Sequence, residues 1–118
     1  MYGLPNNIDL NFLIQRQLLQ ICFGENEMIM NFDDNLSITL TSKCAFSFDG
    51  DNLQIIENYS TSASLICNLI GHFINEIKAS ENGTLAMNFS GNNIFILYDD
   101  DKFYESYWIK SKTSIIVV

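Results

Sequence analysis

Basic residues are scarce in this sequence. Six Lys and Arg stand against fourteen Asp and Glu, which gives a formal net charge of −8 at pH 7. Such a charge repels phosphate backbones and anionic lipid surfaces, so we expect no nucleic acid partner and no membrane association. The same charge would attract a cationic protein, although acidic residues also serve solubility alone. Any protein partner is therefore expected to be basic.

Long apolar runs and a secretory leader are also missing. No stretch approaches the roughly 18 uninterrupted apolar residues of a membrane span. The opening MYGLPNNIDL lacks a basic start followed by an apolar run, so we expect a cytoplasmic protein. With 47% hydrophobic and 13% aromatic residues, the 118-residue chain can build one packed core, and we expect a single domain over residues 1–118.

Groups that carry chemistry are few. Cys22, Cys44 and Cys67 are widely spaced and form no CxxC pair, which favours reduced thiols over a disulfide framework or a zinc site. His72 is the single histidine, so a nucleophile has little choice of base and we expect no enzyme. Aspartates gather in turns, but none completes a calcium-loop spacing, and no Gly-rich phosphate loop occurs. We therefore expect no metal and no cofactor.

An internal repeat is the most informative feature that is present. The segment ENEMIMNFDDNLSITL at 25–40 returns as ENGTLAMNFSGNNIFIL at 81–97, and LIQRQLLQICFGEN at 13–26 aligns with LIGHFINEIKASEN at 69–82. The second copy needs two single-residue insertions, and both fall in expected turns. Because a half-length unit cannot bury its apolar face alone, we expect two similar units packed about a pseudo-twofold axis.

Within each copy the apolar residues recur with a period of two, which predicts half-buried antiparallel strands. Met28, Met30 and Phe32 share one face in the first copy, and Gly, Asp and Asn occupy the expected turns. We expect an α+β fold, mainly antiparallel β, with two duplicated β-meander units at about 13–49 and 69–110. The strands are expected near 17–23, 27–33, 36–42, 44–49, 73–79, 84–90, 93–98 and 103–110.

One or two short helices are expected to introduce the copies. Residues 62–70 combine a Ser or Thr cap, apolar residues at helical spacing and a following Gly71. Residues 9–15 have Asp9 as a cap and are long enough for a single turn. Two further segments, 53–56 and the apolar run TSIIVV at 113–118, are expected to pair as strands or to be buried.

The densest aromatic segment, KFYESYWIKSK at 102–112, supplies a candidate interface. Alternation places Tyr104 and Trp108 on the outward face of the last strand. Phe95 and Leu97 are expected to join them from the outward face of another strand. Exposed Tyr and Trp anchor protein interfaces, although a helix, the linker or the C-terminal run could also cover this patch.

A candidate polar cluster comes from the opposite face of the same segment. There Glu105 lies between apolar positions and would need a cationic partner. Arg16 and His72 occupy equivalent positions in the repeat and are the available partners. The alternative is that Glu105 lies at the rim of the sheet and is hydrated. The cluster of Arg16, His72 and Glu105 is assigned no catalytic role.

Several motifs carry a family resemblance. The opening MYGLP, LIGHFI at 69–74, GTLAMNF at 83–89 and YESYWI at 104–109 together resemble an uncharacterised family of small bacterial proteins, known only as a domain of unknown function. The likeness covers nearly the whole chain. The YES-aromatic-x-Ile strand is also similar to a segment of small acidic proteins that look like immunity partners of bacterial toxins. This resemblance implies inhibition by binding, and it implies no site residues.

We therefore expect a non-catalytic protein-binding module, in its most specific form an immunity-type inhibitor of a basic bacterial toxin. Two alternatives stay open. One is a small-molecule-binding protein that uses the cleft between the two repeats, with Arg16, His72 and Glu105 as its polar groups. The other is a homodimeric structural protein that associates through the exposed edge of the second unit.

Overall fold

The structure is a computed structural model that describes residues 9–57, 65–99 and 105–118. Antiparallel strands dominate it, as expected. They are β1 (Leu18–Phe23), β2 (Met28–Phe32), β3 (Ser37–Leu40), β4 (Cys44–Ser47), β5 (Gln54–Ile56), β6 (Ile74–Ala79), β7 (Leu85–Phe89), β8 (Asn93–Leu97), β9 (Tyr107–Lys110) and β10 (Ile115–Val117). Each predicted strand overlaps an observed one, and β5 and β10 lie in the two segments expected to pair.

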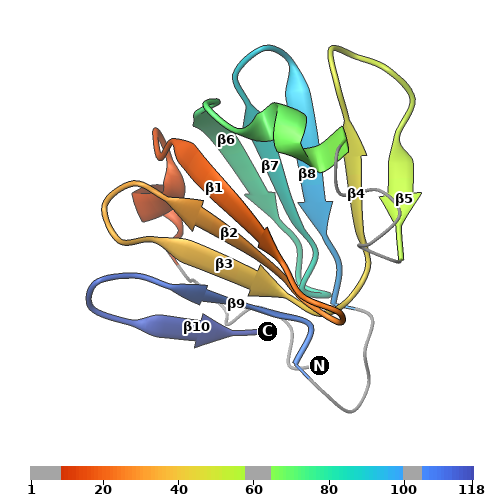
Figure 1. The fold of residues 1–118 in the computed structure, drawn as a ribbon. Coiled ribbons are helices and arrows are strands. Elements are labelled where there is room, and N and C mark those ends of the chain that lie inside the picture. The colour runs from red at the N-terminus through yellow and green to blue at the C-terminus, as the bar shows by residue number, and fades with distance from the viewer. Residues whose placement is uncertain (1–8, 58–64, 100–104) are drawn as a thin grey trace.

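The strands form two five-stranded sheets, with the orders β1-β2-β3-β9-β10 and β5-β4-β8-β7-β6. Figure 1 shows the sheets fanning out from the place where β1 and β6 lie side by side. Within the described residues, no helix has the length and apolar character needed to span a membrane.

The expected α+β class is shown only in its β part. Short helical turns do lie where the two helices were expected: η1 (Asn11–Leu13) in the first copy, and α-helical Leu65 and Ile66 followed by η2 (Cys67–Leu69) in the second. Because the described turns are only a few residues long, the fold is nearly all β. Residues 62–64 of the second predicted helix lie outside the described residues. Leu13 and Leu69 are fully buried at the ends of these turns. The next residues, Ile14 and Ile70, are already extended, because the chain must enter β1 and β6 a few residues later.

The expected four-stranded meanders are also wrong, because the two copies exchange their last strands. β4 pairs with β8 of the second copy rather than with β3. β9 correspondingly pairs with β3 of the first copy. Each sheet is therefore a three-stranded meander from one copy, extended by a hairpin from the other.

Short hydrogen bonds hold the chain where it passes from β3 in one sheet to β4 in the other. The Thr41 backbone N–H donates to the Ser106 carbonyl at 2.9 Å, and the Thr41 hydroxyl donates to the Glu105 carbonyl at 2.9 Å. The Ser42 hydroxyl donates to the Tyr98 carbonyl at 2.7 Å. Since the segment before β9 already occupies the bonding groups beyond β3, β4 must continue into the other sheet.

The pseudo-twofold axis passes between the starts of β1 and β6, where Gln17 and Phe73 form an antiparallel bridge. Four backbone hydrogen bonds repeat the same contact in both directions across the axis. They are Gln15 N–H to Ile74 O (2.7 Å), Gly71 N–H to Leu18 O (2.8 Å), Ile74 N–H to Arg16 O (3.0 Å) and Leu18 N–H to His72 O (3.0 Å). β1 and β6 also share a register shift just after this point.

The predicted turn chemistry is confirmed at equivalent places in the two copies. Asp34 and Asn35 between β2 and β3 both have φ of 59°, and Gly91 and Asn92 between β7 and β8 have φ of 77° and 61°. Two successive residues with positive φ define the type I′ turn, whose twist matches that of antiparallel strands. Asn and Asp tolerate this conformation better than other residues that carry a Cβ.

One hydrophobic core joins the inner faces of the two sheets. Phe32 and Phe89, which are equivalent residues, stack with ring centroids 6.3 Å apart. Tyr107 from the first sheet is fully buried, and its hydroxyl donates a 2.7 Å hydrogen bond to the Gly83 carbonyl in the β6–β7 turn of the second. Burial, together with the nearby Asp99 charge, raises the pKa of Tyr107 above its usual value, so the hydroxyl keeps its proton.

We expect Tyr107→Phe to lower the free energy of unfolding by about 1–3 kcal/mol, because the buried Gly83 carbonyl would lose its donor. Urea unfolding measures the change. Tyr98→Phe is the matched control: Tyr98 is half-buried, and its ring faces the Lys43 ammonium at 5.4 Å. Removing its hydroxyl should change stability by less than about 0.5 kcal/mol. Equal effects of the two substitutions would contradict the assignment.

Strand exchange makes each half of the chain depend on the other. If the protein is co-expressed as residues 1–60 and 61–118, the halves should co-purify in a 1:1 complex with dispersed amide NMR signals. A half expressed alone should aggregate or form an exchanged homodimer, because its fourth and fifth strands have no sheet to join. A half that is folded and monomeric would contradict the exchange.

Candidate functional site

β5 is the outer strand of its sheet and presents apolar side chains to solvent. Leu53 is 47% exposed and Ile55 is 60% exposed. Asp49 and Asp51 lie in the preceding turn and Glu57 directly follows β5, and all three are exposed. We call these five residues the acidic edge. Since no described strand pairs with the outer side of β5, its exposed apolar residues lie where another strand could add.

β10 is the outer strand of the other sheet and holds the equivalent position. Ile115 is 62% exposed and Val117 is 39% exposed. Lys110 and Lys112 lie at the end of β9 and in the β9–β10 turn. We call these four residues the basic edge. The exchange thus makes β5 and β10 outer strands, and each of them has apolar side chains on the solvent face.

The basic edge continues into a row of side chains that crosses the outer face of its sheet. The register places Val117 beside Trp108, Trp108 beside Thr39, and Thr39 beside Ile29. Trp108 and Ile29 are half-buried, and Thr39 is nearly buried. Trp108 is therefore outward-facing on β9, as the alternation predicted.

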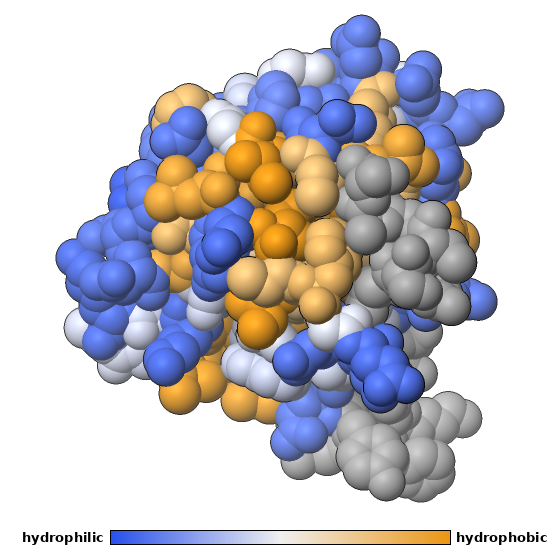
Figure 2. Space-filling view, in the orientation of Figure 1, coloured by the Kyte–Doolittle hydropathy of each residue, from blue (hydrophilic) through white to orange (hydrophobic). Residues whose placement is uncertain are grey.

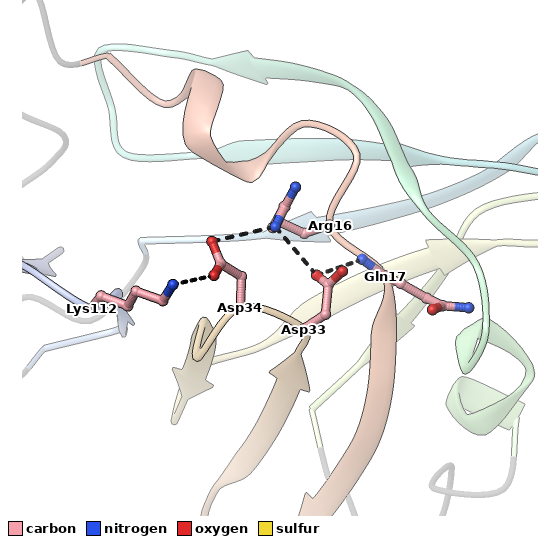
Figure 3. A network of polar contacts seen from close by, with 5 residues as sticks. All are labelled: Arg16, Gln17, Asp33, Asp34 and Lys112. Carbon is pink, nitrogen blue, oxygen red and sulfur yellow. Dashed lines mark hydrogen bonds and ion pairs between the residues drawn. The ribbon is translucent and has the colours of Figure 1, made fainter.

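A network of charged side chains holds the β9–β10 turn against the first copy (Figure 3). Arg16 Nη1 lies 3.8 Å from Asp33 Oδ1 and 3.4 Å from Asp34 Oδ2, and Lys112 Nζ lies 2.5 Å from Asp34 Oδ1. Asp33 also accepts a 3.1 Å hydrogen bond from the Gln17 backbone N–H. The network therefore connects the start of β1, the β2–β3 turn and the exchanged hairpin.

Asp34 is the centre of this network. The hydrogen bond from Lys112 and its positive charge lower the pKa of the Asp34 carboxyl, and Arg16 adds to the effect. The pKa is depressed, so the favourable interaction is present at neutral pH and is lost as the pH falls through the folded-state value. The turn is held most firmly when Asp34 is ionised.

A hollow of about 290 Å³ opens beside the network, between η1, the β2–β3 turn and the β9–β10 turn. Its lining residues are Phe12, Arg16, Asp34, Leu36, Ser111, Lys112, Thr113 and Ser114. The charged side chains in the lining are paired with one another, but the buried Arg16 Nε has no hydrogen-bond partner among the described residues. The hollow lies between a turn and an exchanged hairpin rather than in the predicted cleft between the repeats. Phe32 and Phe89 stack across that seam.

Of the predicted interface residues, Trp108 has the expected outward position, whereas the expected exposure of Phe95 and Leu97 is wrong. Trp108 is half-buried on the outer face. Phe95 and Leu97 are fully buried in the core, so they cannot form a surface patch. The register explains the error, because Phe95 lies opposite Met87 and Leu97 opposite Leu85, and both of those face the core. Tyr104 lies outside the described residues.

The predicted polar cluster is not assembled. Glu105 is exposed, which confirms the hydrated alternative, and its backbone carbonyl accepts from the Thr41 hydroxyl. Arg16 pairs with Asp33 and Asp34, whereas His72 Nδ1 lies 2.9 Å from Ser90 Oγ. No hydrogen bond or ion pair between described residues joins the side chains of Arg16, His72 and Glu105.

The His72–Ser90 contact has a structural counterpart in the first copy. Ser90 Oγ accepts from the Phe73 backbone N–H at 3.1 Å, just as the Asp33 carboxylate accepts from Gln17 N–H. Arg16 and His72 occupy equivalent positions beside these two acceptors. The His72–Ser90 contact is therefore the second-copy counterpart of the Arg16–Asp33 contact, and both fix the start of a strand.

Another apolar area lies around β1 and η2, in the middle of the face drawn in Figure 2. The exposed apolar side chains in this part of the chain are Leu19, Leu65, Ile70 and Phe73. The backbone beside them is already bonded across the β1–β6 junction, for instance Gly71 N–H to Leu18 O. A further strand could not add at this point, which sets the area apart from the two edges.

The structure adds little ligand chemistry elsewhere. Among the residues in 9–57, 65–99 and 105–118, no three His, Cys, Asp or Glu side chains are grouped as metal ligands. Cys44 is buried, and burial raises the pKa of its thiol to about 12, whereas Cys22 and Cys67 are half-buried. The two edges therefore remain the candidate functional site.

Comparisons with protein families, with curated proteins and with solved structures gave no match.

The acidic edge was missed by the sequence analysis, although a signal was present. In DGDNLQIIE, Leu53 and Ile55 alternate with Gln54 between acidic residues, which is typical of a strand with an apolar outer face. That the strand would lie at the outside of its sheet depends on the exchange, which the local pattern does not contain.

Lys112→Met should raise the pKa of Asp34 toward its ordinary value, because the mutation removes both the hydrogen bond and the nearest positive charge. A carboxyl ¹³C NMR titration of Asp34 measures the change. Lys110→Met is the matched control, since no ion pair between described residues joins Lys110 to Asp34. An Asp34 pKa that is the same in both variants would contradict the role of Lys112.

Proposed function

We propose that this chain is a non-catalytic protein-binding module that binds a basic partner protein through the acidic edge. In its most specific form, the proposal is an immunity-type inhibitor of a basic bacterial toxin that acts in the cytoplasm. The proposal depends on the outer strand β5, where Leu53 and Ile55 are exposed. Two exposed carboxylates, Asp49 and Asp51, precede these residues in the chain, and a third, Glu57, follows them.

The chemistry of this edge favours an extended, basic segment of a protein. A strand that adds to a sheet edge gains main-chain hydrogen bonds, while alternate side chains supply specificity. Burial of Leu53 and of Ile55 in the complex would each stabilise binding by at most about 1.5–3 kcal/mol. Asp49, Asp51 and Glu57 would then face Lys or Arg of the partner at the rim, where charges mainly increase the association rate.

The net charge of −8 extends this attraction beyond the contact itself. A strongly negative surface raises the local concentration of a cationic partner and repels anionic molecules. Nucleic acids, which carry a dense negative charge, are thereby disfavoured at long range. The inhibitor would act by covering a basic surface rather than by altering it chemically.

A small-molecule function has less support. The seam between the repeats is occupied by the Phe32–Phe89 stack, and the charged groups of the hollow near Lys112 are paired with one another. In the hollow, Arg16 Nε is the one buried side-chain polar atom of the described residues without a hydrogen-bond partner, and a single such atom falls short of the several converging polar groups typical of ligand sites. Among the described residues, by contrast, no strand pairs with the outer side of β5 or β10, and exposed apolar side chains lie on the same two strands.

Selection of random peptides displayed on phage tests the proposal. We expect enrichment of sequences that alternate apolar residues with Lys or Arg. The variant Leu53→Lys/Ile55→Lys should reduce the affinity of a selected synthetic peptide at least tenfold, because it removes the apolar contacts and adds like charge. The matched control is Ile115→Lys/Val117→Lys at the equivalent position of β10, which should keep the affinity. Enriched peptides without basic residues, or equal losses in both variants, would contradict the proposal.

A further inference from the structure

The duplication gives the chain two equivalent edges. Cys44 pairs with Leu97, and Tyr107 pairs with Leu40. Leu40 lies opposite Met28 as Leu97 lies opposite Leu85, so the two leucines are structural equivalents, and the second expected insertion, which would match Leu40 to Tyr98, is wrong. β4 therefore corresponds to β9, and β5 to β10. Under this correspondence Leu53 matches Ile115 and Ile55 matches Val117, so both edges carry two exposed apolar residues at the same positions.

The two edges differ in charge. The hairpin of residues 44–57 contains Asp49, Asp51 and Glu57 and no Lys or Arg. The hairpin of residues 106–118 contains Lys110 and Lys112 and no Asp or Glu. The edges are thus alike in shape and apolar pattern and opposite in charge, which makes each one complementary to the other.

The backbone groups of β10 have the orientation that strand addition requires. Tyr107 and Val118 bond to each other through both backbone groups, at 3.4 and 2.9 Å. Because bonded and non-bonded pairs alternate along antiparallel strands, the N–H and C=O groups of Ile115 and Val117 point away from β9. The correspondence assigns Leu53 and Ile55 the same orientation on β5.

We propose that the acidic edge of one copy of this chain pairs with the basic edge of a second copy as antiparallel strands. Ile55 would lie opposite Ile115 and Leu53 opposite Val117, so outward backbone groups meet and apolar side chains share one face. Glu57 would then lie next to the turn that carries Lys112. The contact is heterologous, so further copies can add in the same way.

This inference rests on the proposed function at one point, the availability of the acidic edge. A basic, apolar strand is the chemistry proposed for the partner, and the basic edge of a second copy has that chemistry. Self-association would therefore occupy the partner-binding edge at high protein concentration, and a tighter-binding partner would displace it. With β5 and β10 only three residues long, the contact is weak and concentration-dependent.

Two single substitutions distinguish a contact between an acidic and a basic edge from a contact between two like edges. Ile55→Pro and Ile115→Pro each remove an outward N–H and block one edge, and proline is tolerated where the N–H faces solvent at an edge strand. In sedimentation velocity, the wild-type protein should show a weight-average mass that increases with concentration. Each variant alone should stay at the mass of one chain. A mixture of both variants should form a 1:1 dimer, with twice the mass of one chain and no larger species.

Other results would overturn the proposal. If Ile55→Pro alone still dimerises and Ile115→Pro does not, the contact joins two basic edges, and the reverse result joins two acidic edges. A wild-type chain that stays monomeric over about a hundredfold range of concentration contradicts any edge contact. If a proline variant does not fold by circular dichroism, Ile55→Lys and Ile115→Asp replace the proline variants, because each adds a charge of the same sign as the edge it faces, and the same masses are expected.

The peptide experiment separates failure of this proposal from failure of the proposed function. Ile115→Pro should bind the selected basic peptide as the wild-type chain does, and Ile55→Pro should lose at least about tenfold in affinity. Peptide binding without self-association would leave the proposed function standing and remove only the contact between copies. Self-association without peptide binding would support the contact between copies and contradict the proposed function.

Discussion

The exchange of hairpins between the two copies is the constraint on which the rest of the structure depends. After β3, the backbone N–H groups of Thr41 and Ser42 are hydrogen-bonded to the Ser106 carbonyl, in the segment before β9. The chain therefore turns away from the first sheet at Thr41–Ser42, because β9 already pairs with β3. β4 then completes the other sheet beside β8. The two halves must fold around each other, and the Gln17–Phe73 bridge fixes where their axis lies. Neither sheet contains only residues of one copy.

The exchange also decides which strands lie at the outside of the sheets. β1 and β6 meet at the axis, so their first backbone groups are bonded to each other. β5 and β10 are carried to the outside of the sheets. The exposed apolar residues on these two strands are therefore a consequence of topology. Natural sheets usually protect such edges with charge, and here the charges have opposite signs on the two edges. Under the proposed function, these charges would also select the partner.

Equivalent positions in the two copies perform the same structural task with different chemistry. The carboxylate of Asp33 and the hydroxyl of Ser90 both accept a backbone N–H at the start of a strand. The exchanged hairpins are held differently as well. Lys112 binds Asp34 in one sheet, whereas the Asp49 N–H donates to the Asn93 side chain at 3.0 Å in the other. Backbone geometry was kept through the duplication, while side-chain charge diverged.

The sequence by itself determined the strands, the turns and the repeat, because periods of two and Gly, Asn or Asp at turns act over a few residues. It also placed Trp108 on the outer face. It could not orient β8, where NIFIL is apolar at nearly every position and only pairing with β7 sends Phe95 inward. Tertiary structure alone decided which strands are neighbours, and hence which strands lie at the sheet edges. Strand pairing joins residues far apart in the chain, and the alternating pattern of one strand fits more than one possible neighbour.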